Sequence, residues 1–225
     1  QSTKNDLIKF YKVDENKIMV AHLGYDVGAS FSRPLLDSGG QARPLQQPYI
    51  LFLSTLQPRK NLEGLIEAFK QLKTENPELP HKLVVVGRPG WKFEDIVKKI
   101  DENKDIVVYL NHVSDEDRFV ILGKADLLVL PSFYEGFGMT ILEAFSAGVP
   151  VATSNVSSMS EVAGEAAVYF DPRNIAEIKN AIKSVLLDKS LSENLKTKGL
   201  ARLKDFSWQK CAAETLKILT DNYDR

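Results

Sequence analysis

The stretch YILFLSTLQPRKNLEGLIEAFKQLKTENPELPHKLVVVG, residues 49–87, decides the fold. It opens with an apolar run at 49–55, of the kind found in strands that are buried on both faces. A second apolar run at 82–87 closes it, and the segment between the two runs has a helical apolar face. That face is made of Leu62, Leu65, Ile66, Phe69 and Leu72. Two apolar strands joined by an amphipathic helix predict a parallel pair connected by a crossover.

The same alternation of strand and helix continues along the chain. Further strands are expected at 105–110, 126–131, 150–154 and 166–170. Helices are expected at 92–103, 115–124, 138–147 and 158–163, and three more at 174–187, 190–204 and 207–222. The pattern predicts the α/β class: a Rossmann-like parallel sheet with helices on both faces, forming a single domain over residues 1–225.

The chain before residue 49 is less regular. Residues 2–11 have helical spacing of apolar side chains, and Ser2 is the expected cap. Residues 16–26 read as a short buried strand that ends in a turn at Gly24, and residues 28–48, with their glycines and prolines, as a surface loop.

Composition restricts the possible functions. The 225 residues are 44% hydrophobic, and 29 Lys+Arg against 30 Asp+Glu give a net charge of −1, which argues against a protein built to bind nucleic acid or an anionic membrane. The single cysteine, Cys211, cannot form an intrachain disulfide, so we expect a reducing compartment such as the cytoplasm. No apolar run approaches the roughly 18 residues of a membrane span, and no secretory signal opens the chain. Because the first residue is Gln1, we expect a fragment of a longer protein.

Ligands of parallel sheets bind outside the carboxyl ends of the strands, so residues that follow strands are the first candidates. Arg59 and Lys60 follow the first strand of the alternation. An arginine fork beside a lysine point charge could hold phosphate oxygens, and the alternative is an exposed basic pair. Gly87 and Arg88 follow the next strand, where Gly87 permits close approach and Arg88 contacts a ligand or belongs only to a turn.

The acids after the third strand are explained by helix capping. Ser114 is a good N-cap with an acid three residues on, and Asp115–Asp117 lie in the favourable first turn. These residues formally match an Asp-x-Asp metal motif, but no metal site is expected. The histidines also lack ligand spacing; they are His22, His81 and His112.

The run EGFGMTILE, residues 135–143, places two glutamates beside glycines in an apolar region. Gly136 and Gly138 allow a tight turn and close approach to a ligand, and the helix that begins near Gly138 offers free amides to an anion such as diphosphate. Glu143 needs partners among its apolar neighbours. Two sugar hydroxyls would satisfy it, as would a backbone amide or a lysine. Ile141 replaces the third glycine of the dinucleotide fingerprint, so that fingerprint is absent.

The run FYEGFGMTILEAFSAGVPVATSN (133–155) resembles the E-x7-E signature of the retaining glycosyltransferases of the GT4 family, which have the GT-B fold. Four further segments resemble that family in the same order: STLQPRKNLEGLIEAF (54–69), VVVGRPGW (84–91), LNHVSDEDRFVILGKADLLVLPS (110–132) and FSWQKCAAETL (206–216). In this fold a C-terminal Rossmann-like domain binds the nucleotide-sugar donor and an N-terminal one holds the acceptor. The resemblance implies that the chain is the donor half, and that its last segment, 207–225, would cross toward an absent N-terminal domain.

The resemblance also implies roles for single residues. Arg59 and Lys60 would hold the donor diphosphate and, with Glu135 on the transferred sugar, form the catalytic set. The remaining donor-binding residues would be Gly136, Phe137, Gly138, Met139 and Thr140 through their backbone, Glu143 on the ribose, and Arg88 and Val113 beside the base. The turn at 22–26 departs from the Asn-Gly-Val-Asp of many members. That turn and GRPGW (87–91) look like those of mannosyltransferase-type members.

The function that this resemblance implies is transfer of mannose or another hexose from a GDP- or UDP-sugar to an acceptor hydroxyl, with retention of configuration. No further cofactor and no metal is expected. An acceptor glycan or lipid-linked sugar, and any membrane surface, would be met through the missing domain, so the fragment alone should bind donor but transfer little. The alternatives are a nucleotide-sugar epimerase, a non-catalytic nucleotide-binding module, or a doubly wound interaction domain without a ligand.

Overall fold

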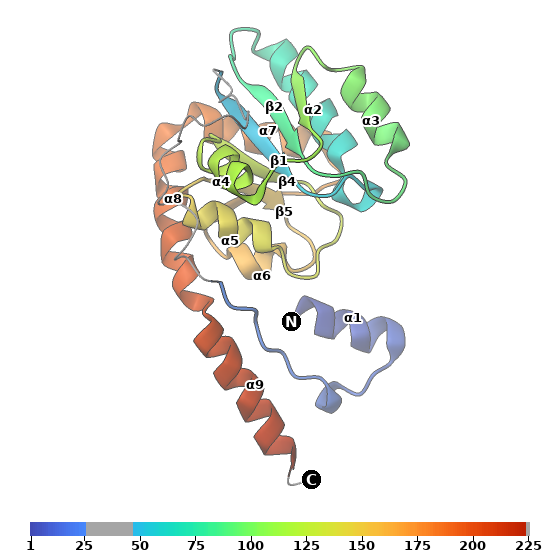
Figure 1. Cartoon of the computed structure of the whole chain (residues 1–225), viewed down its shortest axis with the longest axis vertical. Coiled ribbons are helices and arrows are strands. Elements are labelled where there is room, and N and C mark those ends of the chain that lie inside the picture. Colours follow the sequence, from blue (N-terminus) through green and yellow to red (C-terminus); the bar gives the residue numbers. More distant parts are fainter. Residues whose placement is uncertain (26–46, 224–225) are drawn as a thin grey trace.

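The computed structural model describes residues 1–25 and 47–223 and is built on one parallel sheet (Figure 1). Its six strands are β1 (Tyr49–Leu53), β2 (Lys82–Val86), β3 (Val107–Leu110), β4 (Leu127–Leu130), β5 (Val151–Ser154) and β6 (Ala167–Phe170). They lie in the order β3-β2-β1-β4-β5-β6, and every neighbouring pair is parallel. The predicted fold class is confirmed, and the strands end within two residues of their expected limits.

Helices follow most of the strands. They are α1 (Ser2–Tyr11), α2 (Leu62–Glu75), α3 (Glu94–Asp101), α4 (Asp115–Gly123), α5 (Met139–Ser146), α6 (Met159–Ala163), α7 (Ile175–Leu187), α8 (Lys189–Arg202) and α9 (Trp208–Tyr223). Short 3-10 turns are η1 (Glu15–Lys17), η2 (Pro58–Lys60) and η3 (Leu203–Asp205). Ser114 caps α4 as predicted, because its Oγ accepts from the amide of Asp117 at 3.1 Å.

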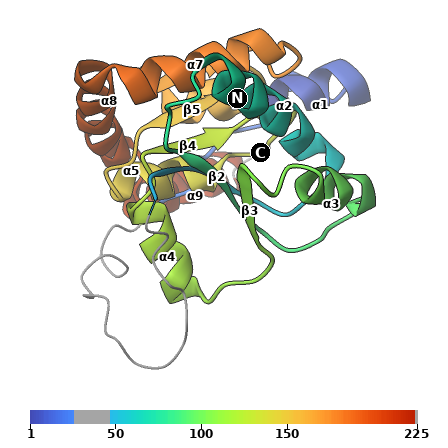
Figure 2. The same cartoon turned by 90° about the horizontal axis from the view of Figure 1, so that it is seen from above.

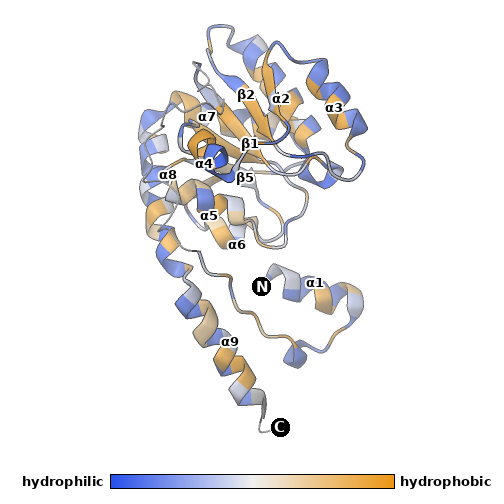
Figure 3. Ribbon diagram, viewed as in Figure 1, coloured by the Kyte–Doolittle hydropathy of each residue, from blue (hydrophilic) through white to orange (hydrophobic). Residues whose placement is uncertain are grey.

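The sheet separates two hydrophobic cores. Alternate residues of β1 point to opposite sides: Ile50 and Phe52 belong to the core under α2, α3 and α7, whereas Leu51 belongs to the core under α4, α5 and α6. Figure 2 shows α2 and α7 on one side of the sheet and α4 and α5 on the other. The hydropathy colouring agrees, since the strands are orange and the outer helix faces blue (Figure 3). Continuous apolar strands are therefore explained by burial on both faces.

The strand order reverses at β1, which pairs with β2 on one side and β4 on the other. A crevice for ligands is expected at such a switch point, outside the carboxyl ends of the two strands whose connections diverge. The loops that follow β1 and β4 meet there, because the amide of Phe133 donates to the carbonyl oxygen of Arg59 at 2.8 Å. The fold thus brings residues 54–61 and 131–138 together.

The expected strand at 16–26 is wrong where the structure describes it. Residues 18–25 form no strand: Ile18 and Val20 line a hollow with Leu7 of α1 and Val162 of α6, whereas Met19 and Leu23 are exposed. Gly24 packs closely on the start of α9, since a Cβ there would come within 2.3 Å of the Trp208 amide nitrogen. The expected loop at 28–48 lies, up to residue 46, outside the described residues.

The predicted cap of α1 is also wrong. The helix begins at Ser2 itself, with Gln1 at the cap position and no side-chain cap bond. The amide of Ser2 donates instead to Glu161 Oε2 at 3.1 Å, so a carboxylate of α6 satisfies this first amide of the helix. In the described part of the chain, no helix is both long and apolar enough to cross a membrane.

Candidate active site

Glu135 lies in the loop after β4 and is held by the residues after β1. Lys60 Nζ lies 2.5 Å from its Oε1, and Arg59 Nη1 lies 3.1 Å from its Oε2. Ser132 donates to the same Oε1 at 2.7 Å. The Lys60 and Glu135 side chains are 11% and 12% exposed, whereas Arg59 is 44% exposed. The three residues predicted as catalytic therefore form one cluster at the switch point, and only Arg59 fits the exposed-pair alternative.

The charge of Glu135 is fixed by these donors. Burial alone would raise the pKa of its carboxyl group, but hydrogen bonds from Lys60 and Ser132, the charge of Lys60 and a bond from Arg59 outweigh it. The pKa of Glu135 therefore lies below its ordinary value of 4.5. The group is a carboxylate at neutral pH, and it neutralises cations that would otherwise repel each other at one side of the crevice.

Two serines after β5 hold the loop that carries Glu135. The Glu135 carbonyl oxygen accepts from Ser157 Oγ at 2.5 Å and from Ser158 Oγ at 2.9 Å. Ser158 Oγ also donates to the carbonyl oxygen of Phe137 at 3.0 Å. The sequence interpretation did not name these serines. A cluster of small polar residues directly after a buried strand is the signal that could have indicated them.

The two glycines of the loop, Gly136 and Gly138, differ in backbone conformation and in the space around them. Gly138 has φ of 99° and stands at the cap position of α5, so the left-handed conformation requires it there. Gly136 has no positive φ, and a Cβ at this residue would meet nothing within 4 Å. The amides of Met139 and Thr140, at the start of α5, make no hydrogen bond within the described residues. The structure therefore leaves open space at Gly136 beside two free amides.

Glu143 has a partner that the sequence interpretation missed. Arg118 Nη1 lies 2.9 Å from both Oε1 and Oε2 of Glu143. Within residues 1–25 and 47–223, an arginine of α4 holds this carboxylate, instead of the lysine or backbone amide of the alternatives. Thr140, one turn earlier on α5, lines one cavity together with Arg118.

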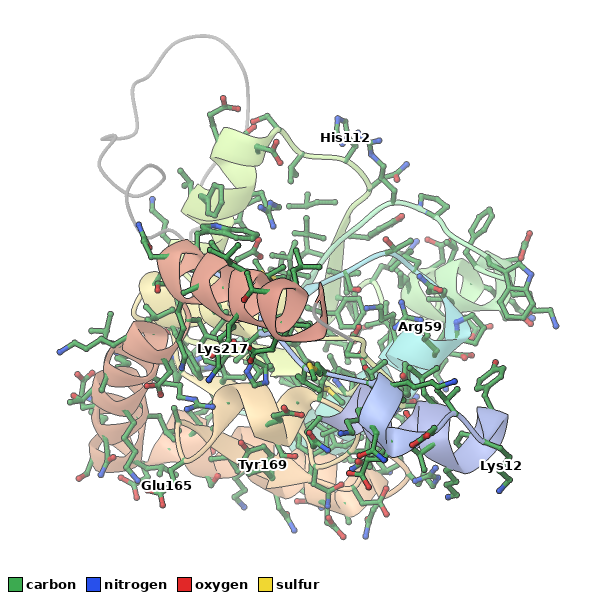
Figure 4. All side chains as sticks on the ribbon, turned by 90° about the horizontal axis from the view of Figure 1, so that it is seen from below. Lys12, Arg59, His112, Glu165, Tyr169 and Lys217 are labelled. Atoms are coloured by element: carbon green, nitrogen blue, oxygen red, sulfur yellow. The ribbon has the colours of Figure 1, made fainter. Side chains whose placement is uncertain are left out.

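A cavity of about 400 Å³ opens at the carboxyl ends of β1, β2 and β3. Arg88, Val113, Thr140 and Arg118 line it, so three residues predicted to bind the nucleotide share one space. Arg88 Nη2 lies 3.0 Å from Nδ1 of His112, which also lines the cavity. Figure 4 labels Arg59 and His112, which lie in segments that follow different strands. The sequence predicts no metal-ligand role for His112 and gives no sign that it is a partner of Arg88.

A larger hollow, of about 480 Å³, lies at the opposite ends of the strands. Its wall includes His81 before β2, Asp126 before β4 and Val149 before β5. His81 Nε2 pairs with Asp126 Oδ2 at 3.3 Å. Because ligands of open parallel sheets bind at carboxyl ends, we place the candidate site in the smaller cavity. Over residues 1–25 and 47–223, no three His, Cys, Asp or Glu side chains gather closely enough to hold a metal ion.

Comparison with known proteins identifies the family. The family model described as "Glycosyl transferases group 1" matches residues 37–202. The chain belongs to this family. It is 40% identical over 173 residues to the O-antigen chain mannosyltransferase B of Escherichia coli, covering 76% of this chain and 45% of that protein. It is 27% identical to the serotype-specific mannosyltransferase WbdA of the same species, over 100% of this chain and 28% of that protein.

Solved structures of similar fold also include glycosyltransferases. Sucrose-phosphate synthase from Thermosynechococcus elongatus superposes with a TM-score of 0.79 at 23% identity, over 99% of this chain and 57% of that one. The arrangement is the Rossmann-like one of GT-B glycosyltransferases. The chain spans less than half the length of the two curated relatives named above.

Proposed function

We propose that this chain is the donor-binding part of a retaining glycosyltransferase that moves a hexose, mannose first, from a nucleoside diphosphate sugar to an acceptor hydroxyl. The observation that carries the proposal is the cluster of Arg59, Lys60 and Glu135 at the switch point, beside the open start of α5. Two relatives that are mannosyltransferases favour mannose.

The cluster suits a leaving diphosphate. When the anomeric bond breaks, negative charge develops on the phosphate oxygen that leaves. Arg59 and Lys60 are cations already fixed at the crevice, and the amides of Met139 and Thr140 point from the positive end of α5. These groups need little reorganisation during the reaction, which is the condition for electrostatic stabilisation.

Glu135 would serve as the counter-charge that keeps this cluster in place while its remaining lone pairs contact the transferred sugar. Each carboxylate oxygen can accept two hydrogen bonds. Oε1 already accepts from Lys60 and Ser132, whereas Oε2 accepts from Arg59. The free position on Oε2 is the one that a sugar hydroxyl would take.

The donor is bound in the neighbouring cavity in this proposal. The nucleoside occupies the space between Arg88, Val113 and Thr140. Glu143, which pairs with Arg118 on the wall of this cavity, contacts the ribose. The acceptor, a glycan or a lipid-linked sugar, is bound by a part of the protein outside this chain. The fraction of its relatives that the chain spans supports that division. We therefore expect the chain alone to bind nucleotide but to transfer sugar poorly.

Calorimetric titration with GDP, UDP and ADP, with and without magnesium, tests the proposal. We expect one nucleotide to bind, and Lys60→Ala to weaken its binding at least tenfold, because a charged hydrogen bond to phosphate contributes about 1.5–3 kcal/mol. Arg59→Ala should weaken binding less, because Arg59 is more exposed. Lys98→Ala, on the exposed face of α3, is the control and should leave affinity unchanged.

Two results would contradict the proposal. Absence of binding by all three nucleotides would remove the donor site, and unchanged affinity in Lys60→Ala would remove the phosphate assignment. Analysis of products made by the longer protein, with a nucleoside diphosphate mannose as donor, separates transfer from epimerisation.

A further inference from the structure

Arg118 stands between the nucleotide cavity and Glu143. It lies one turn into α4, and its side chain is 27% exposed against 13% for Glu143. Arg118 lines the cavity, whereas Glu143 is not among the lining residues. A nucleoside that enters the cavity therefore meets the guanidinium of Arg118 before, or together with, the carboxylate behind it.

Only one nitrogen of the Arg118 guanidinium, Nη1, makes hydrogen bonds within the described residues. Nη1 makes both bonds to Glu143, and Nε is buried without a hydrogen bond, 3.7 Å from Asp115 Oδ1. Within residues 1–25 and 47–223, Nη2 has no hydrogen-bond partner. Arginine carries five N–H donors, so the Nη2 pair remains for a ligand in the cavity.

Glu143 also keeps capacity for a ligand. A carboxylate offers about four lone-pair positions, and Arg118 occupies one on each oxygen. The two side chains together thus present donors and acceptors at neighbouring points. A pair of adjacent hydroxyls, each of which donates one hydrogen bond and accepts others, is the complementary chemical group.

We propose that Arg118 and Glu143 form one recognition unit for the ribose of the donor nucleotide. Arg118 Nη2 donates to a ribose hydroxyl oxygen, and Glu143, oriented by Nη1, accepts from the hydroxyls. Arg118 is then a nucleotide-binding residue that fixes selectivity for ribose. This inference rests on the proposed function and adds to it a residue that neither the sequence interpretation nor the comparisons named.

Binding of a ribonucleoside diphosphate and of its 2′-deoxy counterpart, by calorimetry on the whole chain, tests the inference. The wild type should prefer the ribonucleotide by about tenfold or more, since a bond to a charged group is lost with the hydroxyl. Arg118→Ala and Glu143→Gln should each reduce that preference to about twofold or less. The double variant should be no less selective than either single one, because each change already disables the unit.

Two variants keep the test interpretable. Lys124→Ala, at the C-terminal end of the same helix and outside the cavity, should retain the full preference. Arg118→Lys keeps the positive charge and a donor for Glu143, but it lacks the second, rigidly placed nitrogen, Nη2, to which the ribose contact is assigned. It should therefore lose the preference as Arg118→Ala does, and it carries the test if the alanine variant does not fold.

The outcomes separate the two proposals. If the wild type binds ribonucleotide selectively and the Arg118 variants keep that selectivity, the inference is overturned while the proposed function stands. Equal losses for the ribo- and deoxy-nucleotide would also overturn it, because they would indicate a general effect on the site. If the wild type binds no nucleotide, the proposed function fails and the inference fails with it.

Discussion

Glu135 is the residue on which the charges of the candidate site depend. Its carboxylate joins Arg59 and Lys60, which belong to the loop after β1, to a loop after β4 that lies about 75 positions later in the chain. The Lys60 side chain is nearly buried, so keeping its charge without this partner would cost folding free energy. One side chain therefore affects the stability of the crevice and, in the proposed function, the two cations that would bind phosphate.

The dependence of stability on pH should report this role. The folded pKa of Glu135 lies below its ordinary 4.5, so its contribution is present above about pH 4.5 and is lost as pH falls through the folded pKa. Glu135→Gln should lower the free energy of unfolding by about 3 kcal/mol at pH 7, because Lys60 is left without its counter-charge. Urea unfolding of both proteins at pH 7 and at pH 3 should show this difference shrinking at the lower pH.

Glu165→Gln is the matched control for that measurement. Glu165 is 92% exposed, and its contact with Lys198 is 3.5 Å, so its removal should change stability little at either pH. A difference between wild type and Glu135→Gln that stays constant between pH 7 and pH 3 would contradict the assigned charge of Glu135.

The sequence predicted the members of the site better than their contacts. Arg59, Lys60 and Glu135 were found because polar residues directly after buried strands are informative. Their mutual pairing could not be read, since the distance between the two loops depends on β1 lying beside β4. Arg118 carried no signal at all, because a single arginine in a helix is usually a solvent-exposed charge.

Two glycines just before α5 allow the effects of backbone strain and of open space to be compared. Gly138 has φ of 99°, and Gly136 has no positive φ and open space around it. Gly138→Ala should therefore cost about 1–2 kcal/mol of stability, because an L-residue is strained in the left-handed region. Gly136→Ala should leave stability within about 0.5 kcal/mol but weaken nucleotide diphosphate binding, because its methyl group would enter the space beside the α5 amides.

Thermal unfolding and calorimetry on the two variants check this contrast. The expected result is a lower Tm for Gly138→Ala alone and a lower affinity for Gly136→Ala at unchanged Tm. Equal destabilisation by both changes would mean that Gly136 also has a structural role. Unchanged affinity in Gly136→Ala would move the ligand away from this loop.

Elements were predictable where burial leaves no ambiguity. Strands covered on both faces read as continuous apolar runs, which explains why six strands ended within two residues of their expected positions. The strand expected at 16–26 is wrong because an apolar run predicts burial, whereas the apolar side chains of this segment are at most half-buried and Met19 and Leu23 are exposed. Ile18 and Val20 face Leu7 of α1 and Val162 of α6, so the segment needs no strand partner.

In the whole molecule, the long terminal helix α9 is much less buried than the helices that cover the sheet of the Rossmann-like body. Figure 1 shows α9 running away from the sheet, toward the side where α1 lies. No described side chain of α9 is buried, and Leu216 and Leu219 are each 62% exposed. By contrast, α8 buries Leu195 and Gly199, the latter against Phe145 of α5.

This asymmetry predicts that the body folds without most of α9. Removal of residues 211–225 keeps the contact between Gly24 and the start of α9 and removes no residue that the structure describes as buried, so Tm should change by less than about 3 °C. Nucleotide affinity should also persist, because the cavity is lined by residues from other elements. Truncation before residue 189, which also removes the buried side of α8, should abolish cooperative unfolding. A large loss of stability in the shorter truncation would show that α9 supports the donor site through contacts with the body, and would contradict a body that is stable without it.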